Sequence, residues 1–337
     1  MSCEWSDKIF GVAESGFQPL ALEVFRFQYN NCPVYNSYVN ALDIDVSAVN
    51  SLEKIPYLPV SFFKTNTIQS GEFKAALIFE SSGTTGTINS KHSIKDISLY
   101  TTSFLKNFEA AYGDPARCCV IGLLPSYMER KNSSLVYMVD DLIKKCRHPL
   151  SGFYLDDFEK LNETLKTLEG KKKKTILIGV TYALLDFAEK FPQPLNSTII
   201  IETGGMKGRR QELTRMEVHA KLKQAFGLAA VHSEYGMTEL LSQAYAKQEG
   251  KFQTPPWMKV LIRDDEDPFE VNSQQYFLNN SVLKRLTGAI NIIDLANVYS
   301  CSFIATDDAG TLYGDGSFEV LGRLDGSDLR GCSLLVV

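Results

Sequence analysis

Hydroxyl side chains and glycines are concentrated in one short segment, which reads Ser81-Ser82-Gly83-Thr84-Thr85-Gly86 and follows the apolar residues 75–79. The apolar run predicts a buried strand. Glycine lets the backbone turn tightly and approach a ligand closely, and successive backbone N–H groups in such a turn form an anion-binding concavity. This segment, here called the hydroxyl loop, therefore predicts a site for nucleotide phosphates. It is not a Walker loop, because no Gly-Lys-Ser/Thr follows its second glycine; an ordinary surface turn is the alternative.

Two further polar segments directly follow predicted strands. Glu202-Thr203-Gly204-Gly205 ends the run 197–202, and Ser233-Glu234-Tyr235-Gly236-Met237-Thr238-Glu239 follows the run 228–232. Ligands bind beyond the carboxyl ends of the strands of an open α/β sheet. Paired glycines let a flat base lie on the backbone, an aromatic ring can stack on it, and a carboxylate can hold Mg²⁺ beside substrate phosphates. A plain turn and a capped helix start are the alternatives.

A third segment, residues 306–323, combines acidic turn residues with an arginine. Its Asp307-Asp308-Ala309-Gly310 and Gly314-Asp315-Gly316 stretches predict the turns of antiparallel hairpins. An acidic side chain there can accept both hydroxyls of a ribose, and Arg323 can pair with a phosphate. A Gly/Asp-rich hairpin that carries an ordinary surface arginine would have the same composition.

The composition is that of a globular protein with a sizeable core. The chain has 337 residues, 44% of them hydrophobic and 22% charged, with a net charge of −5. This charge does not favour nucleic acid as a partner. No apolar run is long enough to span a bilayer. The seven Cys show no Cys-x-x-Cys spacing and the four His are scattered, so we expect no metal cluster and a cytoplasmic location.

The elements that must position these segments alternate between strand and helix. Strands are expected at 75–79, 118–124, 175–180, 197–202 and 228–232, and helices at 155–168, 182–190 and 214–226, the last ending at Gly227. Such alternation predicts a parallel sheet flanked by helices. Helical and irregular structure is expected before residue 75, with an extended segment at 55–64, and short antiparallel strands are expected after residue 256. We therefore expect an α/β core over residues 1–256 and a β-rich subdomain over 257–337.

The four polar segments, in this order, resemble the motifs of the adenylate-forming enzymes: acyl-CoA synthetases, luciferases and peptide-synthetase adenylation domains. The matches lie at 82–86, 204–205, 235–239 and 306–323, and the resemblance extends over about residues 56–332. Residues 55–64 and the ending Arg330-Gly331-Cys332 look like the LuxE-type acyl-protein synthetases within that superfamily. The resemblance implies the large amino-terminal domain of the adenylate-forming fold. It also implies that the mobile carboxy-terminal domain, which would follow in longer members, is lacking.

The resemblance also implies a role for each matching residue. The hydroxyl loop would hold the β- and γ-phosphates of ATP through Ser82, Thr84 and Thr85, and Thr238 the α-phosphate. Glu239 would hold Mg²⁺ and Asp308 the ribose, although Asp307 stands where the family has glycine. The family has a lysine directly after the hydroxyl loop, whereas here the lysine is displaced to Lys91, and that lysine's role is not carried over to it. The residues implied for ATP are Ser81, Ser82, Gly83, Thr84, Thr85, Gly86, Gly204, Gly205, Tyr235, Gly236, Asp308 and Arg323, and those implied for the chemistry are Thr238, Glu239 and Cys332.

We therefore expect an AMP-forming acid–thiol ligase that activates a carboxylic acid, in this family a fatty acid, as its acyl-adenylate. Cys332, near the end of the chain, would then accept the acyl group as a thioester, or a partner protein would receive it; a small apolar tail residue is the alternative for Cys332. Two other readings stay open. The chain could be an acyl-CoA ligase completed by a partner polypeptide, or a nucleotide-binding protein without catalysis.

Overall fold

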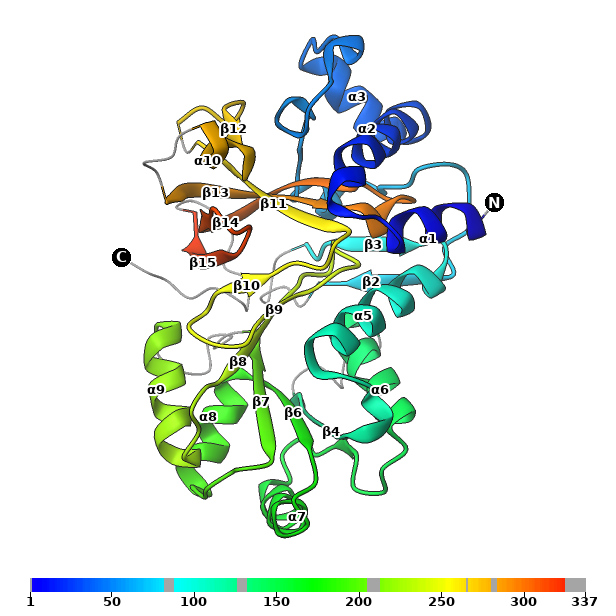
Figure 1. Ribbon diagram of the computed structural model, residues 1–337. Helices are drawn as coiled ribbons and strands as arrows, with labels where there is room; N and C mark the ends of the chain where they lie inside the picture. The colour runs from blue at the N-terminus through cyan, green and yellow to red at the C-terminus, as the bar shows by residue number, and fades with distance from the viewer. Residues whose placement is uncertain are drawn as a thin grey trace. The chain divides into compact units, whose positions relative to one another are not determined.

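The computed structural model describes residues 2–81, 88–125, 132–204, 213–264, 266–279 and 284–324. These residues form two compact units. Unit 1 contains the described residues among 1–104, 236–244 and 253–327, and unit 2 contains those among 105–235 and 245–252 (Figure 1). Helix α5 (Ile97–Tyr112) and the short strands β9 (Ala244–Ala246) and β10 (Phe252–Gln253) lie where the chain passes from one unit to the other. Each unit is described by itself.

Unit 2 is built on a parallel sheet with the strand order β8-β7-β6-β4-β5. Its strands are β4 (Cys119–Leu123), β5 (Gly152–Phe153), β6 (Thr175–Val180), β7 (Thr198–Thr203) and β8 (His232–Tyr235). Every residue of β4 and β6 is buried, because helices cover both faces. Helices α8 (Thr181–Lys190) and α9 (Arg215–Phe226) cover one face and α6 (Ser134–Cys146) the other, while α7 (Phe158–Gly170) precedes β6 (Figure 1). The 3₁₀ helix η3 (Pro115–Arg117) precedes β4.

Most of the expected elements of unit 2 are confirmed. The apolar run 175–180 is strand β6 without a shift. The strand expected at 118–124 is shorter by one residue at each end, and the strand expected at 197–202 is displaced by one residue. Helix α9 starts at a capping box between Thr214 and Glu217 and ends at Gly227, whose φ of 64° is the left-handed conformation that glycine tolerates. The strand expected at 228–232 was wrong, because pairing with β7 brings residues 232–235 into the sheet instead.

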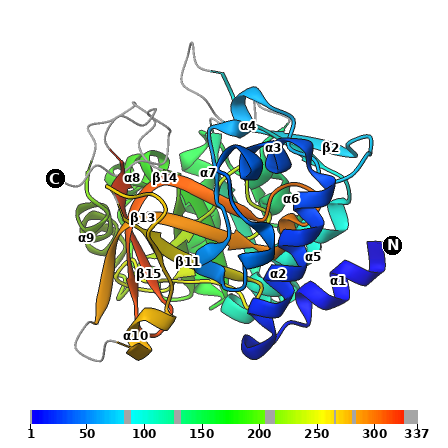
Figure 2. The ribbon, with the colours of Figure 1, turned by 90° about the horizontal axis from the view of Figure 1, so that it is seen from above.

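Unit 1 is built on antiparallel strands in the order β12-β11-β13-β14-β15, with β1 (Leu58–Pro59) parallel to β14. These strands are β11 (Met258–Arg263), β12 (Val271–Asn272), β13 (Arg285–Asp294), β14 (Phe303–Tyr313) and β15 (Phe318–Arg323). The amino-terminal helices α1 (Ser2–Phe10), α2 (Glu14–Asn31) and α3 (Pro33–Ala41) lie beside them (Figure 2). Tyr35 stacks on Phe303 at 6.2 Å between ring centres, and Phe25 meets the same ring edge-on. This aromatic core fixes α2 and α3 to β14.

The remaining elements of unit 1 are short. Strands β2 (Leu77–Glu80) and β3 (Lys91–Ile94) form a separate two-stranded antiparallel sheet on either side of the hydroxyl loop. The other elements are α4 (Phe62–Thr65), α10 (Gln275–Asn279) and the 3₁₀ helices η1 (Val46–Ala48), η2 (Leu52–Lys54) and η5 (Leu295–Asn297). The segment 55–64 is extended as expected up to β1, but its end is the first part of α4.

Two expectations for unit 1 need correction, and one alternative is excluded. The strand expected at 75–79 exists from Leu77, but it is not a buried strand, since Ile78 is 40% exposed and only Phe79 is buried. The alternative of a helix start after Tyr235 is excluded, because residues 236–239 contain a turn and no helix. The turn expected at residues 307–310 is absent, because β14 continues through it, whereas the turn at 314–316 does join β14 to β15. The mixed α/β fold, with a sheet flanked by helices, is as expected.

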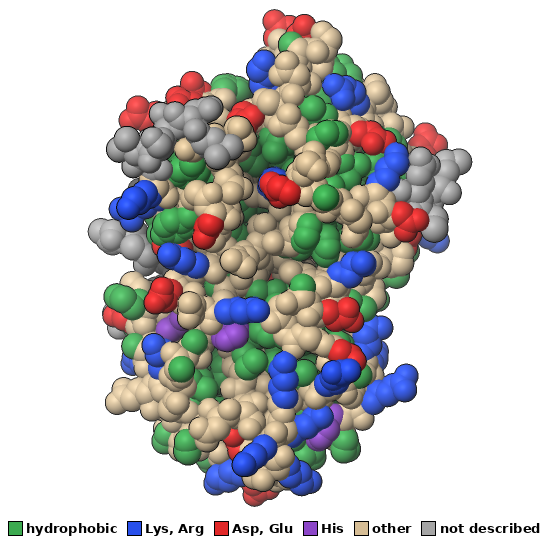
Figure 3. Space-filling view, viewed as in Figure 1, with side chains coloured by type: hydrophobic (Ala, Val, Ile, Leu, Met, Phe, Trp, Pro, Cys, Tyr) green, Lys and Arg blue, Asp and Glu red, His purple; other side chains and the backbone are tan. Residues whose placement is uncertain are grey.

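The outer surface combines charged and apolar side chains. On the face shown in Figure 3, each half carries Lys or Arg as well as Asp or Glu side chains, with hydrophobic side chains scattered among them. Among the helices of the described segments, none is both long and apolar enough to cross a membrane.

Candidate active site

A β-bulge replaces the predicted turn at Asp308. Ala289 pairs with Ala309 and Asn291 with Ala305, so one residue of β13, Ile290, faces three residues of β14, at positions 306–308. The Thr306 hydroxyl donates to the Ile290 carbonyl at 2.8 Å, and the Asp308 N–H donates to the Thr306 Oγ1 at 3.2 Å. Bulges redirect side chains next to active sites. Here the bulge sets the direction of the Asp308 side chain.

Arg323, which lies opposite Asp308 in β15, holds the two acidic side chains of the bulge. Its Nη1 donates to Asp308 Oδ1 at 3.0 Å and its Nη2 to Asp307 Oδ2 at 3.3 Å. The Arg323 and Asp308 side chains are mostly buried, and the Asp307 side chain is more exposed than that of Asp308. Removing one partner of a buried ion pair leaves the other charge uncompensated, which is strongly destabilising. Arg323 thus engages two carboxylates here, which gives it a role in positioning Asp308.

Thr238 and Glu239 occupy a turn that buried side chains of unit 1 hold in place. Asn297 Nδ2 donates to the Glu239 carbonyl at 2.8 Å. Asp294 accepts hydrogen bonds from the N–H groups of Leu241 and Ser242 at 2.8 and 2.9 Å. Burial raises the pKa of Asp294 to about 6, against the lowering effect of these donors. The turn therefore owes its shape to residues far along the chain.

Asp294 and Asn297 were missed in the sequence analysis. Both lie at 0% exposure, where a polar side chain needs partners. A signal was present, since Asp294 directly follows the apolar pair Ile292-Ile293 and its side chain caps η5. The sequence did not show that these side chains reach back to residues 239–242.

His92, on the strand that leads out of the hydroxyl loop, contacts the same turn. Its Nδ1–H donates to the Thr238 carbonyl at 2.9 Å, because a carbonyl can only accept. Its ring is buried, and Phe63 packs edge-on against it. Burial lowers the pKa of His92 to about 4, although the hydrogen bond to Thr238 raises it. His92 is therefore neutral in the folded chain at neutral pH.

This neutral histidine predicts a loss of stability in acid. The unfolded chain takes up the His92 proton near pH 6.5, but the folded chain does so only near pH 4. The contribution of His92 to the free energy of unfolding is thus fully present above pH 6.5. It falls by about 3 kcal/mol as the pH drops to 4 and below. His92→Asn, whose amide keeps a donor near Nδ1, should remove this acid-dependent part. Urea unfolding at pH 7, 5.5 and 4 measures it, and an unchanged pH slope in the variant would contradict the prediction.

Glu239 fits a magnesium ligand by its chemistry. Its carboxylate is a hard oxygen donor in a residue that is 1% exposed. Among the residues that the structure describes, no three His, Cys, Asp or Glu side chains gather into a metal cluster. Mg²⁺ typically binds through one or two carboxylates, with phosphates and water as its other ligands. One buried carboxylate therefore suits an ion that arrives with a nucleotide.

In unit 2, two of the predicted segments lie side by side. Strands β7 and β8 pair in parallel with Glu202 opposite Ser233, and Ser233 Oγ donates to Glu202 Oε1 at 2.8 Å. One residue further on, the Thr203 hydroxyl donates to Glu234 at 2.5 Å. Gly204 follows with a φ of 82°, which glycine adopts without strain. The structure thus joins the Gly204 segment to the strand that ends at Tyr235.

The two glutamates of this cluster differ in protonation. Burial raises the pKa of Glu202, but the hydrogen bond from His219 and the charge of Arg215 outweigh burial and bring it to about 2. Burial raises the pKa of Glu234 to about 7; the hydrogen bond from Thr203 opposes the rise and the charge of Glu202 adds to it. The cluster therefore holds one firm negative charge, on Glu202, next to the Arg215 guanidinium.

Tyr235 has an aromatic and cationic surrounding within unit 2. Its ring centre lies 5.9 Å from that of Phe252, and the Arg215 guanidinium lies 5.1 Å from the Phe252 ring centre. Aromatic and arginine planes of this kind stack on flat ligands such as bases. The surroundings of Tyr235 are therefore compatible with an adenine.

The described residues of the predicted site are divided between the two units. Unit 1 holds Ser81, Gly236, Thr238, Glu239, Asp308 and Arg323, and unit 2 holds Gly204 and Tyr235. Ser81 lies at the base of the hydroxyl loop, where its N–H donates to the Ser90 carbonyl and its Oγ accepts from the Ser90 N–H. Seven predicted residues lie outside the described ones: Ser82, Gly83, Thr84, Thr85, Gly86, Gly205 and Cys332.

The chain resembles adenylate-forming enzymes of known structure. A luciferase-like enzyme from the mealworm Zophobas morio is 16% identical, with 84% of this chain and 62% of that one covered and a TM-score of 0.47. The O-succinylbenzoate coenzyme A synthetase of Bacillus subtilis, in complex with ATP and magnesium, is 16% identical, with 78% and 55% covered and a TM-score of 0.49. A long-chain-fatty-acid–CoA ligase of Archaeoglobus fulgidus is 14% identical, with 74% and 52% covered and a TM-score of 0.49.

The chain spans between about half and two thirds of the length of these three structures. A search of curated proteins gave no match. The sequence model of the acyl-protein synthetase (LuxE) family matches residues 12–337, which is nearly the whole chain. The chain therefore belongs to the acyl-protein synthetase (LuxE) family.

Proposed function

We propose that the chain activates a carboxylic acid with ATP and passes the acyl group to a protein thiol. The observation that carries this proposal is the bulge of β14, which directs Asp308 toward Arg323 at 3.0 Å. A firmly held carboxylate of this kind suits the two hydroxyls of a ribose, which only donate well to an oriented acceptor. Membership in the acyl-protein synthetase family supports the same activity.

In the first step, the substrate carboxylate attacks the α-phosphorus of ATP, and pyrophosphate leaves as the acyl-adenylate forms. Positioning and charge neutralisation account for most of the catalysis in such a displacement. Asp308 would hold the ribose and Thr238 the α-phosphate. A magnesium ion bound at Glu239 would neutralise phosphate charge. Asn297 and His92 hold the backbone carbonyls of Glu239 and Thr238, so the backbone of this turn is fixed before ATP arrives.

The adenine would lie against the backbone of Gly204 and Gly205 and the ring of Tyr235. The parallel pairing of β7 with β8 supports this assignment, because it joins the two segments in one unit. The firm negative charge on Glu202 is matched within its cluster by Arg215. The cluster would therefore shape this surface without opposing an anionic ligand.

In the second step, the thiolate of Cys332 would attack the acyl carbonyl. A thioester forms, the bond to the phosphate oxygen breaks, and AMP leaves. The acid is expected to be a fatty acid, as the resemblance implies, and the protein would carry it as acyl-enzyme or pass it to a partner protein.

Incubation with ATP, Mg²⁺ and a radiolabelled fatty acid tests the proposal. We expect covalent label that is released by hydroxylamine, as a thioester is. Cys332→Ser should lose the label and keep ATP–pyrophosphate exchange, because its adenylation step is intact; Cys301→Ser, at a buried cysteine, is the matched control. Label retained by Cys332→Ser would contradict the thioester step. Exchange that requires coenzyme A would favour a ligase, and nucleotide binding without exchange over acids of graded length would favour a non-catalytic protein.

A further inference from the structure

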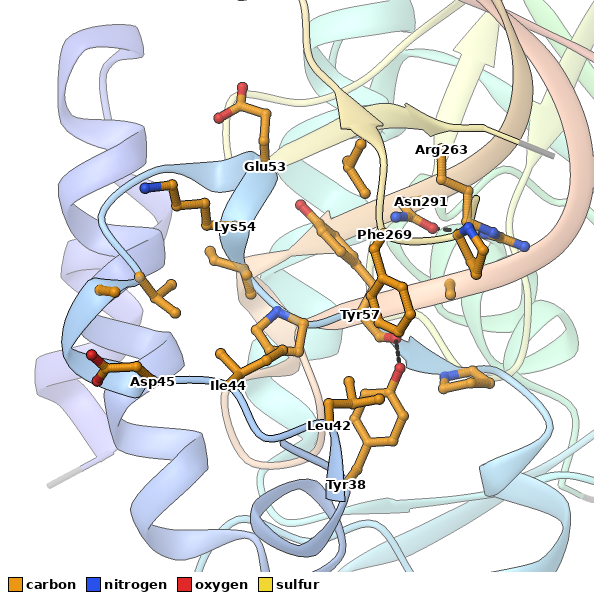
Figure 4. A pocket seen from close by; sticks show the side chains of 18 of the residues that line it. Tyr38, Leu42, Ile44, Asp45, Glu53, Lys54, Tyr57, Arg263, Phe269 and Asn291 are labelled. Atoms are coloured by element: carbon orange, nitrogen blue, oxygen red, sulfur yellow. Dashed lines mark hydrogen bonds between the residues drawn. The ribbon is translucent and has the colours of Figure 1, made fainter. Parts of the chain in front are cut away.

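Strand β13 carries two buried polar side chains that contact different parts of unit 1. Asn291 lies beside a cavity of about 670 Å³, where its Oδ1 accepts a hydrogen bond from Arg263 Nη1 at 2.7 Å (Figure 4). Asp294, the last residue of the strand, is not among the described residues that line this cavity. Its carboxylate contacts the segment that follows Thr238 and Glu239 instead. Asp294 is therefore the side chain of this pair that contacts the candidate active site.

Four hydrogen-bond donors converge on the Asp294 carboxylate. Its Oδ2 accepts from the N–H groups of Leu241 and Ser242 at 2.8 and 2.9 Å. Its Oδ1 accepts from the Ser242 hydroxyl at 2.6 Å and from the Ala296 N–H at 3.1 Å. An ionised carboxylate only accepts hydrogen bonds, whereas the neutral acid must donate one. The contacts around Asp294 therefore match its ionised form.

The Ser242 hydroxyl is the donor in this set that can reverse, because a backbone N–H cannot. Its Oγ lies 3.0 Å from Ser103 Oγ, and Trp257 Nε1–H donates to both oxygens, at 3.0 Å to Ser242 and 3.1 Å to Ser103. Ser103, Ser242 and Asp294 are all at 0% exposure. A proton taken up by Asp294 is thus donated to Ser242 Oγ, and the Ser242 hydroxyl turns toward Ser103.

Protonation of Asp294 also weakens its hold on the backbone of the turn. Hydrogen bonds to a charged acceptor are roughly twice as strong as those to a neutral one, so the bonds from Leu241 and Ser242 lose strength when the carboxylate becomes neutral. These two residues directly follow the turn of residues 237–240, which the Leu240 N–H closes by donating to the Met237 carbonyl at 3.1 Å. The anchor after the turn therefore depends on the charge of Asp294.

Asp294 titrates close to neutral pH. Burial raises its pKa to about 6, although the hydrogen bonds from Ser242, Leu241 and Ala296 lower it. Burial brings the pKa of His92, which contacts the same turn, to about 4, so that its titration lies lower.

The side chains that reach Asp294 from neighbouring elements are uncharged. Among the described residues, the titratable side chains on these elements form no printed hydrogen bond or ion pair with Asp294; they include Asp7, Lys8, His92, Lys106, Glu239 and Lys259.

We propose that Asp294 is a positioning residue for adenylation, whose carboxylate fixes residues 241–242 and through them the turn of Thr238 and Glu239, and whose protonation releases that turn. The inference rests on the proposed function, because the turn acts through Mg²⁺ and the α-phosphate of ATP. Asp294 acts on the backbone and not on the substrate. The rate of adenylation therefore rises with pH as Asp294 ionises.

The fluorescence of Trp257 measures this titration without ATP. The chain has two tryptophans, so Trp5→Phe leaves Trp257, which donates to Ser242, as the single reporter. We expect a transition with its midpoint near pH 6, and Asp294→Asn should abolish it. A signal that does not change between pH 5 and 7.5, or one that persists in Asp294→Asn, would overturn the proposal.

Ser242→Ala tests the same titration if Asp294→Asn fails to fold. It removes a donor to the charged form, so the midpoint should rise by about one pH unit. Ser302→Ala is the matched control, since Ser302 is also a buried serine of unit 1 and its hydroxyl contacts Gln28. Its midpoint should equal that of the wild type. An unmoved midpoint in Ser242→Ala, or equal shifts in both serine variants, would contradict the assignment to Asp294.

ATP–pyrophosphate exchange with a fatty acid then shows whether the titration acts on catalysis. At saturating ATP and Mg²⁺, the wild type should exceed Asp294→Asn about 10-fold at pH 7.5, as loss of a group that orients a metal ligand implies. The ratio should fall to about 2-fold at pH 5, where most of the wild type is protonated. Titration of ATP or of the acid cancels in this ratio. A ratio that is the same at both pH values would overturn the proposal. A wild type without exchange contradicts the proposed function, whereas the fluorescence transition still decides whether Asp294 titrates at the turn.

Discussion

Glu239→Gln is expected to lower the rate of ATP–pyrophosphate exchange by about 100- to 1,000-fold, as removal of one group that stabilises transition-state charge does in other enzymes. The variant keeps the shape of the side chain and removes its charge. Glu239 is 1% exposed, and Asn297 and Asp294 fix the turn around it. The backbone should therefore stay in place, and the loss should reflect the missing ligand for Mg²⁺.

Glu234→Gln is the matched control for this prediction. Glu234 is also a buried glutamate, but its pKa is raised to about 7 by burial, so near neutral pH it is often protonated and already resembles an amide. The rate of ATP–pyrophosphate exchange of Glu234→Gln at pH 6.5 should stay close to that of the wild type. Exchange at the wild-type rate in Glu239→Gln, over a full titration with Mg²⁺, would refute the metal role. Equal losses in both variants would point to a structural effect instead.

The sheet of unit 2 was largely predictable from local sequence. A parallel strand covered by helices on both faces is a continuous apolar run, and residues 175–180 show this pattern throughout. Helix ends were predictable where a cap supplied a signal, as at Gly227. The strand before Tyr235 was misplaced because it is the polar sequence 232–235, which enters the sheet only by pairing with β7. Its local propensity for a strand is weak.

The site in unit 1 depends on contacts that no local pattern reveals. Acidic residues followed by glycine have the composition of a turn, yet the strand continues through 307–310, because the Thr306 hydroxyl and the Arg263 guanidinium satisfy the bulged backbone. Arg263 lies 43 residues from the carbonyl that it contacts. The polar side chains that hold the turn at Thr238 and Glu239 likewise come from residues 92, 294 and 297. Motif residues were therefore identifiable from sequence, but the residues that position them were not.

The second large effect is expected for Asp308→Asn, which should lower ATP–pyrophosphate exchange by about 100-fold. An amide has one acceptor oxygen in place of two and carries no charge, so the hydrogen bonds to a ribose are lost or weakened, and bonds to charged groups contribute about 1.5–3 kcal/mol each. Substrate-saturation curves should show the loss mainly as a higher KM for ATP, because the ribose is bound in the ground state as well as in the transition state.

Asp307→Asn tests whether the bulge selects one aspartate over its neighbour. The two residues are adjacent, and both contact Arg323, at 3.3 Å for Asp307 and 3.0 Å for Asp308. Asp308 also donates its N–H to Thr306 Oγ1, and its side chain is 11% exposed against 29% for Asp307. Asp308 is therefore the more closely held and more buried of the two carboxylates, and Asp307→Asn should keep a near-normal KM for ATP. A higher KM for ATP in Asp307→Asn than in Asp308→Asn would mean that Asp307 holds the ribose. The family motif would then be displaced by one residue in this chain.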